Sequence, residues 1–204
     1  MTERHDAARA ALEAALAATS GGSEAASSGP GAMPGRRQAP PAGEPDPHDI
    51  ARQIVLRQLA LAPKTRKQLE DKLRQRDCPD DVARVVLDRM AAVGLVDDEA
   101  YAGMLVRSQQ VGRGLAKRAL ARELRTKGVD DQIARATLDA IDPEDERERA
   151  RQLVAKRLRT MHGLDPVVQT RRLAGMLARK GYPPDVSMTV IREAVANAPE
   201  HQRD

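Results

Sequence analysis

The sequence predicts an all-α protein made of three tandem three-helix repeats in an elongated array, preceded by a disordered N-terminal extension. Aromatic residues make up 1% of the 204 residues, and Phe and Trp are absent. A core built almost entirely from aliphatic side chains suits packed helices better than strands, which favour aromatic and β-branched residues. In addition, one amphipathic segment recurs twice along the chain, and each copy follows another segment with helical apolar spacing. Each repeat is therefore expected to contain three helices.

The N-terminal residues 1–48 differ in composition from the rest of the chain. Gly, Pro, Ser and Ala dominate residues 19–47, which have no apolar periodicity. Such a segment buries too little apolar surface to offset its ordering entropy, so it is predicted to be disordered. Residues 6–18 have high helix propensity, but Leu12 and Leu16 are their only large apolar side chains. We expect a marginal helix at most, with a docking segment as the alternative.

Pairs of leucines one helical turn apart define the repeats. The pairs are Leu69 with Leu73, Leu120 with Leu124, and Leu173 with Leu177, at successive offsets of 51 and 53 residues. Apolar-periodic segments at 50–61, 98–111 and 144–161 precede these pairs and supply the first helix of each unit. The expected boundaries are 49–97 for the first repeat, 98–142 for the second, 143–196 for the third and 197–204 for a C-terminal tail.

Capping residues agree with this division. The Asp-Pro pairs at 142–143 and 165–166 each place an N-cap carboxylate before a proline at the first helical position. Gly128 and Gly181 lie where a helix is expected to end in the left-handed region, and Asp77 holds the same place in the first repeat. The same kind of turn is therefore predicted in all three repeats.

No spacing in the sequence indicates a catalytic or metal-binding site. The four histidines lie far apart, and Cys78 has no histidine near it in sequence, which favours a packing role. The acidic residues at 97–99 are expected to mark a helix N-terminus, where carboxylates complement the helix dipole. The Gly-Arg-Gly segment at 112–114 lacks the Lys and Ser/Thr of a phosphate-binding loop, so we expect a hinge between helices. The protein is predicted not to be an enzyme and to use no metal or cofactor.

The chain also lacks signals for secretion or membrane insertion. No apolar run approaches the roughly 20 residues that span a bilayer, and a single cysteine cannot form an internal disulfide. Acidic residues interrupt the N-terminus, where a secretory signal would be basic and then apolar. We expect a soluble, cytoplasmic monomer that does not associate with membranes.

Positive charge is concentrated on the second helix of each repeat, above all in the middle repeat. Residues 49–204 carry a net charge of +6, which favours an anionic partner. In the middle repeat, the side of this helix opposite to the leucine pair carries Arg118, Arg122 and Arg125, all within about 30° of one line along the helix surface. We call these three residues the basic stripe. The other candidate contacts are Arg113, Lys117 and Lys127 near this stripe, Lys67 and Arg74 in the first repeat, and Arg171 and Arg172 in the third. A merely solvated helix face is the alternative, although such faces usually intersperse charges of both signs.

The equivalent stripe of basic residues is weaker in the outer repeats. Asp71 interrupts it in the first repeat, and Gly175 and Ala178 lie on it in the third. The middle repeat is therefore expected to supply most of the contact energy, and the outer repeats to set the reach of the array. Because no aromatic residues interleave with the charges, single- or double-stranded DNA would be contacted through its phosphates, with weak sequence preference and strong salt dependence.

A succession of motifs in the middle of the chain resembles the RecX family, bacterial regulators of the recombinase RecA. The matching residues are GLVDDEAYA at 94–102, Arg107, the small residues at 112–114 and ALARELRTKGVD at 119–130. With the repeats, the resemblance covers about 49–195. Tyr101 stands where the family usually has Phe, and Met104 or Leu105 where an aromatic residue is common, but both changes keep an apolar helix face.

The resemblance implies a non-enzymatic protein that lies along the groove of a RecA filament on single-stranded DNA. Such a protein opposes filament growth and damps ATP hydrolysis, strand exchange and the stimulation of repressor cleavage. It would act in DNA repair, recombination and the SOS response, and Arg107 joins the candidate contacts on this ground. The resemblance implies no catalytic residue.

Two other classes of protein remain as alternatives. A helix-turn-helix transcription factor would give a site-specific footprint on duplex DNA, but the third helices expected at 80–90 and 131–140 carry few basic residues. A helical solenoid that binds only protein would bind independently of salt and DNA, but the repeat length exceeds that of the familiar arrays.

Overall fold

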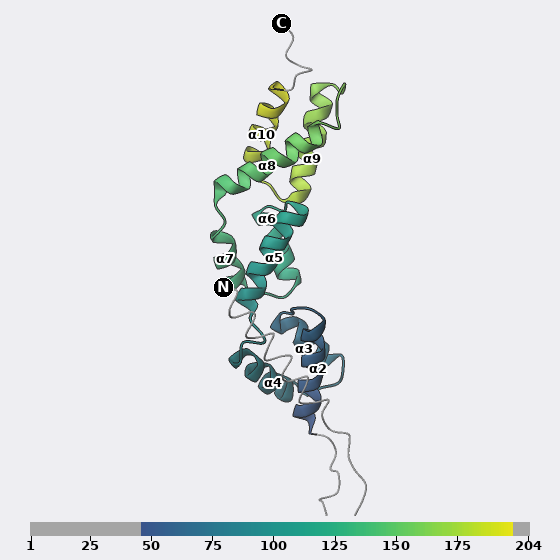
Figure 1. Cartoon of the computed structure of the whole chain (residues 1–204), viewed down its shortest axis with the longest axis vertical. Coiled ribbons are helices and arrows are strands. Elements are labelled where there is room, and N and C mark those ends of the chain that lie inside the picture. The colour runs from purple at the N-terminus through teal and green to yellow at the C-terminus, as the bar shows by residue number, and fades with distance from the viewer. Residues whose placement is uncertain (1–45, 198–204) are drawn as a thin grey trace, which may run out of the picture. The chain divides into compact units, whose positions relative to one another are not determined.

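A computed structural model describes residues 46–197, which fold into helices α2 to α10 without a strand in that range. Figure 1 shows these helices in order along the chain. The predicted all-α class with three three-helix units is confirmed. The predictions for residues 1–45, including the marginal helix at 6–18, and for most of the C-terminal tail lie outside the described residues. None of the described helices is long and apolar enough to cross a membrane.

The chain divides into two compact units, with the boundary between Asp97 and Asp98. The described part of the first unit contains α2 (Pro47–Leu61), α3 (Arg66–Arg74) and α4 (Asp80–Ala92). Leu69 and Leu73 of α3 are buried at the centre of its core, where they pack with Val55 and Leu87. A capping box opens α3, because the backbone N–H of Gln68 donates to Thr65 Oγ1 at 3.2 Å while Gln68 Oε1 accepts from the Thr65 N–H at 3.1 Å.

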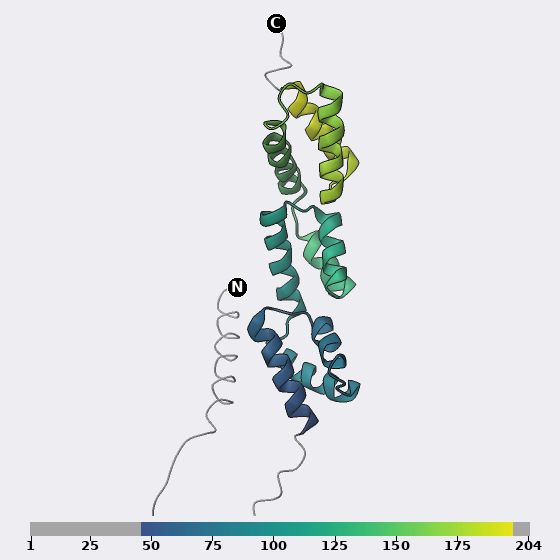
Figure 2. The ribbon, with the colours of Figure 1, turned by 90° about the vertical axis from the view of Figure 1, so that its right-hand side faces the viewer.

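The second unit contains two three-helix bundles that follow each other along the chain (Figure 2). The first consists of α5 (Asp98–Arg113), α6 (Lys117–Thr126) and α7 (Asp131–Asp139), and the second of α8 (Pro143–Leu158), α9 (Pro166–Lys180) and α10 (Pro184–Ala196). Leu120 and Leu124 are fully buried in the first bundle, and Leu173 and Leu177 in the second. The leucine pairs that define the repeats therefore face the core in all three of them.

The helix ends follow the predicted capping signals. The side chains of Asp142 and Asp165 accept hydrogen bonds from the backbone two residues on, each at 2.8 Å. Gly128 and Gly181 have φ values of 74° and 88°, and Asp77 has a φ of 57°, so all three turns use the left-handed region. The structure thus confirms one type of helix end in the three repeats.

Three helix boundaries differ from the sequence prediction. The first helix begins at Pro47 rather than at residue 50, because Asp46 caps it by accepting from the His48 N–H at 2.9 Å. Helix α5 continues to Arg113, so the expected hinge at 112–114 is reduced to a turn at Gly114, with a φ of 61°. Helix α8 ends at Leu158, before the predicted 161.

Candidate functional site

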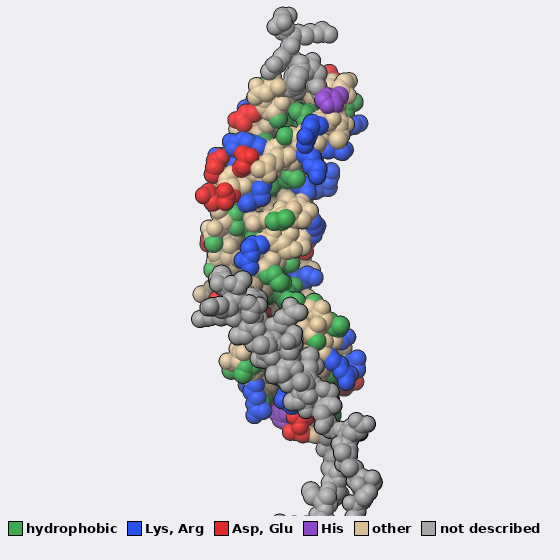
Figure 3. Space-filling model, in the orientation of Figure 1, with side chains coloured by type: hydrophobic (Ala, Val, Ile, Leu, Met, Phe, Trp, Pro, Cys, Tyr) green, Lys and Arg blue, Asp and Glu red, His purple; other side chains and the backbone are tan. Residues whose placement is uncertain are grey.

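The net positive charge of the second unit is concentrated on α6 and α9, because the five basic residues of α8 are accompanied by four acidic ones. Helix α6 carries four basic residues and one acid, Glu123, while α9 carries four basic residues and no acid. Figure 3 shows Lys and Arg side chains gathered over α9 on the face in view. Both helices are amphipathic, so their buried leucines turn most of these cations outward.

The end of α9 is tied to the segment that joins α5 to α6. The backbone N–H of Ala116 donates to the carbonyl of Lys180 at 2.9 Å, and Lys180 Nζ donates to the carbonyl of Arg113. The Tyr182 hydroxyl donates to the carbonyl of Gly114 at 3.2 Å. Burial raises the pKa of Tyr182 to about 12, with Arg149 opposing the rise and Glu146 adding to it, so this phenol stays protonated as a donor. These bonds fix the second and third repeats against each other.

Gly181 allows the two helices to approach closely. A Cβ atom at this position would lie 2.5 Å from the backbone nitrogen of Ala119 and 2.8 Å from its Cβ. The φ of +88° is also unfavourable for a residue with a side chain. Ala116, at the start of α6, correspondingly packs into the core of the third repeat. The glycine that ends α9 therefore also forms the contact between the two repeats.

A carboxylate from the third repeat caps α6. The N-cap residue of α6, Ala116, has no side chain that could accept a hydrogen bond from the first turn. Glu146 of α8 supplies the acceptor instead, because its Oε1 lies 2.7 Å from the backbone nitrogen of Lys117. Glu146 is buried, with 8% of its surface exposed. The negative charge also complements the positive end of the α6 dipole.

We expect Glu146→Gln to lower the free energy of unfolding of the second unit by about 1 kcal/mol, because it removes the charged part of this cap. Urea denaturation followed by circular dichroism measures the change. Glu148→Gln on the same helix is the control, because Glu148 is exposed and its partners, Arg151 and Gln152, are exposed or half-buried neighbours on α8. Such surface contacts contribute at most about 1 kcal/mol and often nothing. Equal stabilities of the two variants would contradict a capping role for Glu146.

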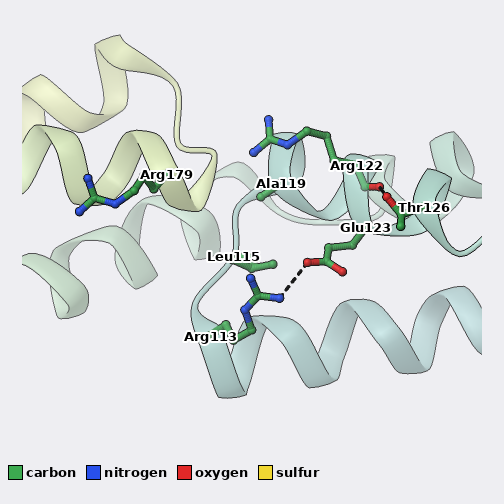
Figure 4. A pocket seen from close by; sticks show the side chains of 7 residues that line it. All are labelled: Arg113, Leu115, Ala119, Arg122, Glu123, Thr126 and Arg179. Atoms are coloured by element: carbon green, nitrogen blue, oxygen red, sulfur yellow. Dashed lines mark hydrogen bonds and ion pairs between the residues drawn. The ribbon is translucent and has the colours of Figure 1, made fainter.

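A hollow lined by arginines lies between α6 and the end of α9. It has a volume of about 320 Å³, and its charged residues are Arg113, Arg122, Arg179 and Glu123. Three uncharged residues labelled in Figure 4 complete its lining. Arg113 Nη1 donates to Glu123 Oε1 at 2.8 Å across the hollow (Figure 4). We call this feature the arginine hollow.

The predicted contact residues are exposed or half-buried, as a contact surface requires. Those exposed are Lys67, Arg74, Arg107, Arg113, Arg118, Arg122, Arg125, Arg171 and Arg172, and those half-buried are Lys117 and Lys127. Among the described residues, neither Arg118 nor Arg122 forms an ion pair, and Arg125 approaches Asp131 only at 4.0 Å. The stripe on α6 is therefore largely free of local acidic partners.

The predicted residues of the first repeat have a different environment. Lys67 Nζ lies 3.0 Å from Asp71 Oδ1, and Arg74 Nη1 lies 3.3 Å from the same oxygen. Asp71, which interrupts the basic line in the sequence, thus neutralises much of it. These two cations are less available to an anionic partner than those of α6.

The arginine hollow contains one arginine, Arg179, that is not among the contacts predicted from the sequence. It brings Arg113 and Arg122 together with Arg179, whereas Arg171 and Arg172 of the same helix do not line it. The sequence places Arg179 only beside the weak basic line of the third repeat. Arg179 lies near α6 because Gly181 packs against Ala119. Helical periodicity in the sequence does not predict that contact.

Cys78 of the first repeat is poorly suited to act as a nucleophile. Burial raises the pKa of the Cys78 thiol, and Asp81 and Asp80 raise it further, which disfavours the nucleophilic thiolate. Cys78 packs against the core of the first repeat, as predicted. No cluster of His, Cys, Asp and Glu within 46–197 could hold a metal ion. The arrangement is suited to binding an anion.

Comparison with known proteins agrees with the repeat architecture. Residues 51–90, 97–138 and 144–191 match, in order, the first, second and third three-helix domains of RecX. A crystal structure of RecX from Lactobacillus salivarius superposes with a TM-score of 0.68 at 25% identity, covering 73% of this chain and 97% of that one.

Curated relatives named Regulatory protein RecX are more similar in sequence. The protein from Thermobifida fusca is 49% identical over 160 residues, which cover 77% of this chain and 86% of the relative. The protein from Streptomyces lividans is 51% identical over 155 residues, covering 75% and 82%. Three matched domains in the correct order, together with this level of identity, show that the chain belongs to the RecX family.

Proposed function

We propose that this protein binds the RecA filament on single-stranded DNA and inhibits filament growth, ATP hydrolysis, strand exchange and the stimulation of repressor cleavage. Its membership of a family of regulatory proteins, with all three domains present, is the observation that supports this function most strongly. The protein would act in the cytoplasm as a monomer and without catalysis of its own.

The stripe of Arg118, Arg122 and Arg125 on α6 is proposed as the main contact with the filament. All three side chains are exposed, and in the part of the chain that the structure describes only Arg125 has an acidic partner, Asp131 at 4.0 Å. Arginine forms bidentate, charge-assisted hydrogen bonds with carboxylates and phosphates, the two anionic groups that a protein–DNA filament presents. Lys117, Lys127 and Arg107 would extend this contact, and the cations of the outer repeats would support it.

The transcription-factor alternative is less well supported. A recognition helix in the major groove needs a surface that attracts phosphates and reads base edges. The third helices α4 and α7 each carry more acidic than basic residues. Insertion of either helix into duplex DNA would therefore be opposed by charge repulsion.

Inhibition of recombinase ATP hydrolysis tests the proposed function. When the purified chain is added to cognate RecA on single-stranded DNA, we expect the rate of ATP hydrolysis to fall as the protein is titrated against filament ends. Bound protein that opposes filament growth lowers the number of active recombinase subunits. A steady ATPase rate at a several-fold excess over filament ends would refute the proposal.

A further inference from the structure

The arginine hollow contains two cations without partners among the described residues. Neither Arg122 nor Arg179 forms a hydrogen bond or ion pair with its side chain there. Arg179 lies back along α9, with its Nη1 3.4 Å from where a Cβ of Gly175 would be, and Figure 4 shows Arg122 extending from α6 toward the α9 side. Arg179 is directed away from Arg122 in Figure 4, so it must turn toward α6 to share an anion with Arg122, and neither side chain has a bond in the described residues to break when it does so.

The backbone that carries these arginines is already held in place. The bonds from Ala116 to Lys180 and from Lys180 to Arg113 join the ends of α5 and α9 to the start of α6. The contact of Gly181 with Ala119 leaves no room for the helices to move closer. Binding of an anion in the hollow therefore orders only side chains. Its entropic cost is lower than if the backbone also had to become ordered.

Glu123 competes with an external anion for the third arginine. Its carboxylate accepts from Arg113 at 2.8 Å and keeps 30% of its side-chain surface exposed, while Arg113 keeps 58%. Because both groups remain hydrated, their ion pair is easily exchanged. An incoming anion can take over Arg113, while the negative charge of Glu123 limits the affinity.

The surroundings of the hollow favour a phosphodiester chain over a single carboxylate. Arg118 and Arg125 on α6 and Arg172 on α9 continue the positive charge on both helices that border the hollow. A nucleic-acid backbone presents an anion at every nucleotide and can meet several of these cations at once. The lining contains no aromatic residue, so base stacking would not contribute.

We propose that the arginine hollow binds a phosphate of the nucleic-acid backbone through Arg122 and Arg179, with Arg113 joining when it leaves Glu123. The ligand is a phosphodiester in single-stranded DNA, held without base preference. This inference deepens the proposed function, because it assigns DNA phosphate as the ligand of one part of the contact surface. It also makes the third repeat a contributor to binding through α9.

Binding of a fluorescently labelled oligothymidylate to the full-length chain, measured by anisotropy without recombinase, tests the proposal. We expect the double variant Arg122→Gln/Arg179→Gln to bind about tenfold or more weakly, because two charge-assisted contacts are lost. The slope of log K against log salt should fall by about 0.7, the value for one phosphate contact on a single strand. Glu123→Gln should bind several-fold more tightly, an increase that misfolding could not produce.

A double variant of exposed arginines outside the hollow, Arg135→Gln/Arg159→Gln, has the same net charge and should keep the wild-type salt slope. Wild-type affinity of the hollow double variant, no tightening by Glu123→Gln, or no binding of DNA by the wild-type chain would each overturn the proposal. Inhibition of recombinase ATP hydrolysis is measured on the same variants. If DNA binding is unchanged while inhibition is lost, the hollow contacts protein, so the phosphate site is refuted while the proposed function stands.

Discussion

Replacing Arg118, Arg122 and Arg125 together by Glu is expected to abolish inhibition of recombinase ATP hydrolysis at concentrations where the wild-type chain inhibits fully. The substitutions turn an exposed positive stripe into a negative one, so they repel an acidic protein surface or DNA phosphate that the stripe attracts. The fold should persist, since the three side chains are exposed and, within residues 46–197, their only ion pair is the 4.0 Å contact of Arg125 with Asp131.

A second triple variant distinguishes the effect of removing these particular charges from the effect of changing the net charge of the protein. Arg135, Lys156 and Arg159 are exposed and lie outside α6 and α9, so their replacement by Glu changes the net charge equally. We expect this control to inhibit as the wild-type chain does, and all three proteins to show the same helical circular dichroism spectrum. Full inhibition by the stripe variant, or equal loss in both variants, would refute the assignment of the stripe.

Gly181→Ala is expected to destabilise the second unit by about 3 kcal/mol, the largest effect that we predict for a single substitution. Part of the cost, about 1–2 kcal/mol, comes from placing a side chain in the left-handed region at a φ of +88°. The rest comes from the new Cβ, which would lie 2.5 Å from the nitrogen of Ala119 and force α9 away from α6. Urea denaturation of the full chain measures the loss.

Gly163→Ala is the matched control for this clash. Gly163 has a φ of +74°, but a Cβ atom there would meet nothing within 4 Å. Its replacement should therefore cost only the backbone strain, about 1–2 kcal/mol. If the two alanine variants proved equally stable, the close approach of α9 to α6 would not be a determinant of stability. The difference between them isolates the energy of that contact.

Much of the fold could be predicted because its signals are local. The leucine pairs reveal which face of each second helix is buried, and the Asp-Pro pairs at 142–143 and 165–166 mark helix starts. The missed start at Pro47 carries the same Asp-Pro signal, at the edge of a Pro-rich segment that suggested disorder. The expected hinge at 112–114 was too long because a glycine inside a helix is tolerated where neighbouring residues continue the helix.

The candidate site was only partly predictable. Helical periodicity places Arg118, Arg122 and Arg125 on one outward face, and the structure finds all three exposed. The cap of α6 could not be foreseen, because Glu146 is 29 residues from the amide that it accepts from. Glu146 belongs to an acidic run at the start of α8 whose other carboxylates, Glu144, Asp145 and Glu148, are exposed, so nothing in the sequence marks it as the buried one.

The sequence by itself determined the helices, the inward leucines, the basic stripe and the family. These depend on spacing within one or two helical turns, where backbone geometry relates sequence directly to position in space. Only the tertiary structure decided that the end of α9 lies against α6 and brings Arg179 to the same hollow as Arg122. Lys180 and Arg113 are 67 residues apart, and their contact depends on how two amphipathic bundles pack and on the missing side chain of Gly181. Such packing depends on shape complementarity between surfaces, which no periodicity in the chain records.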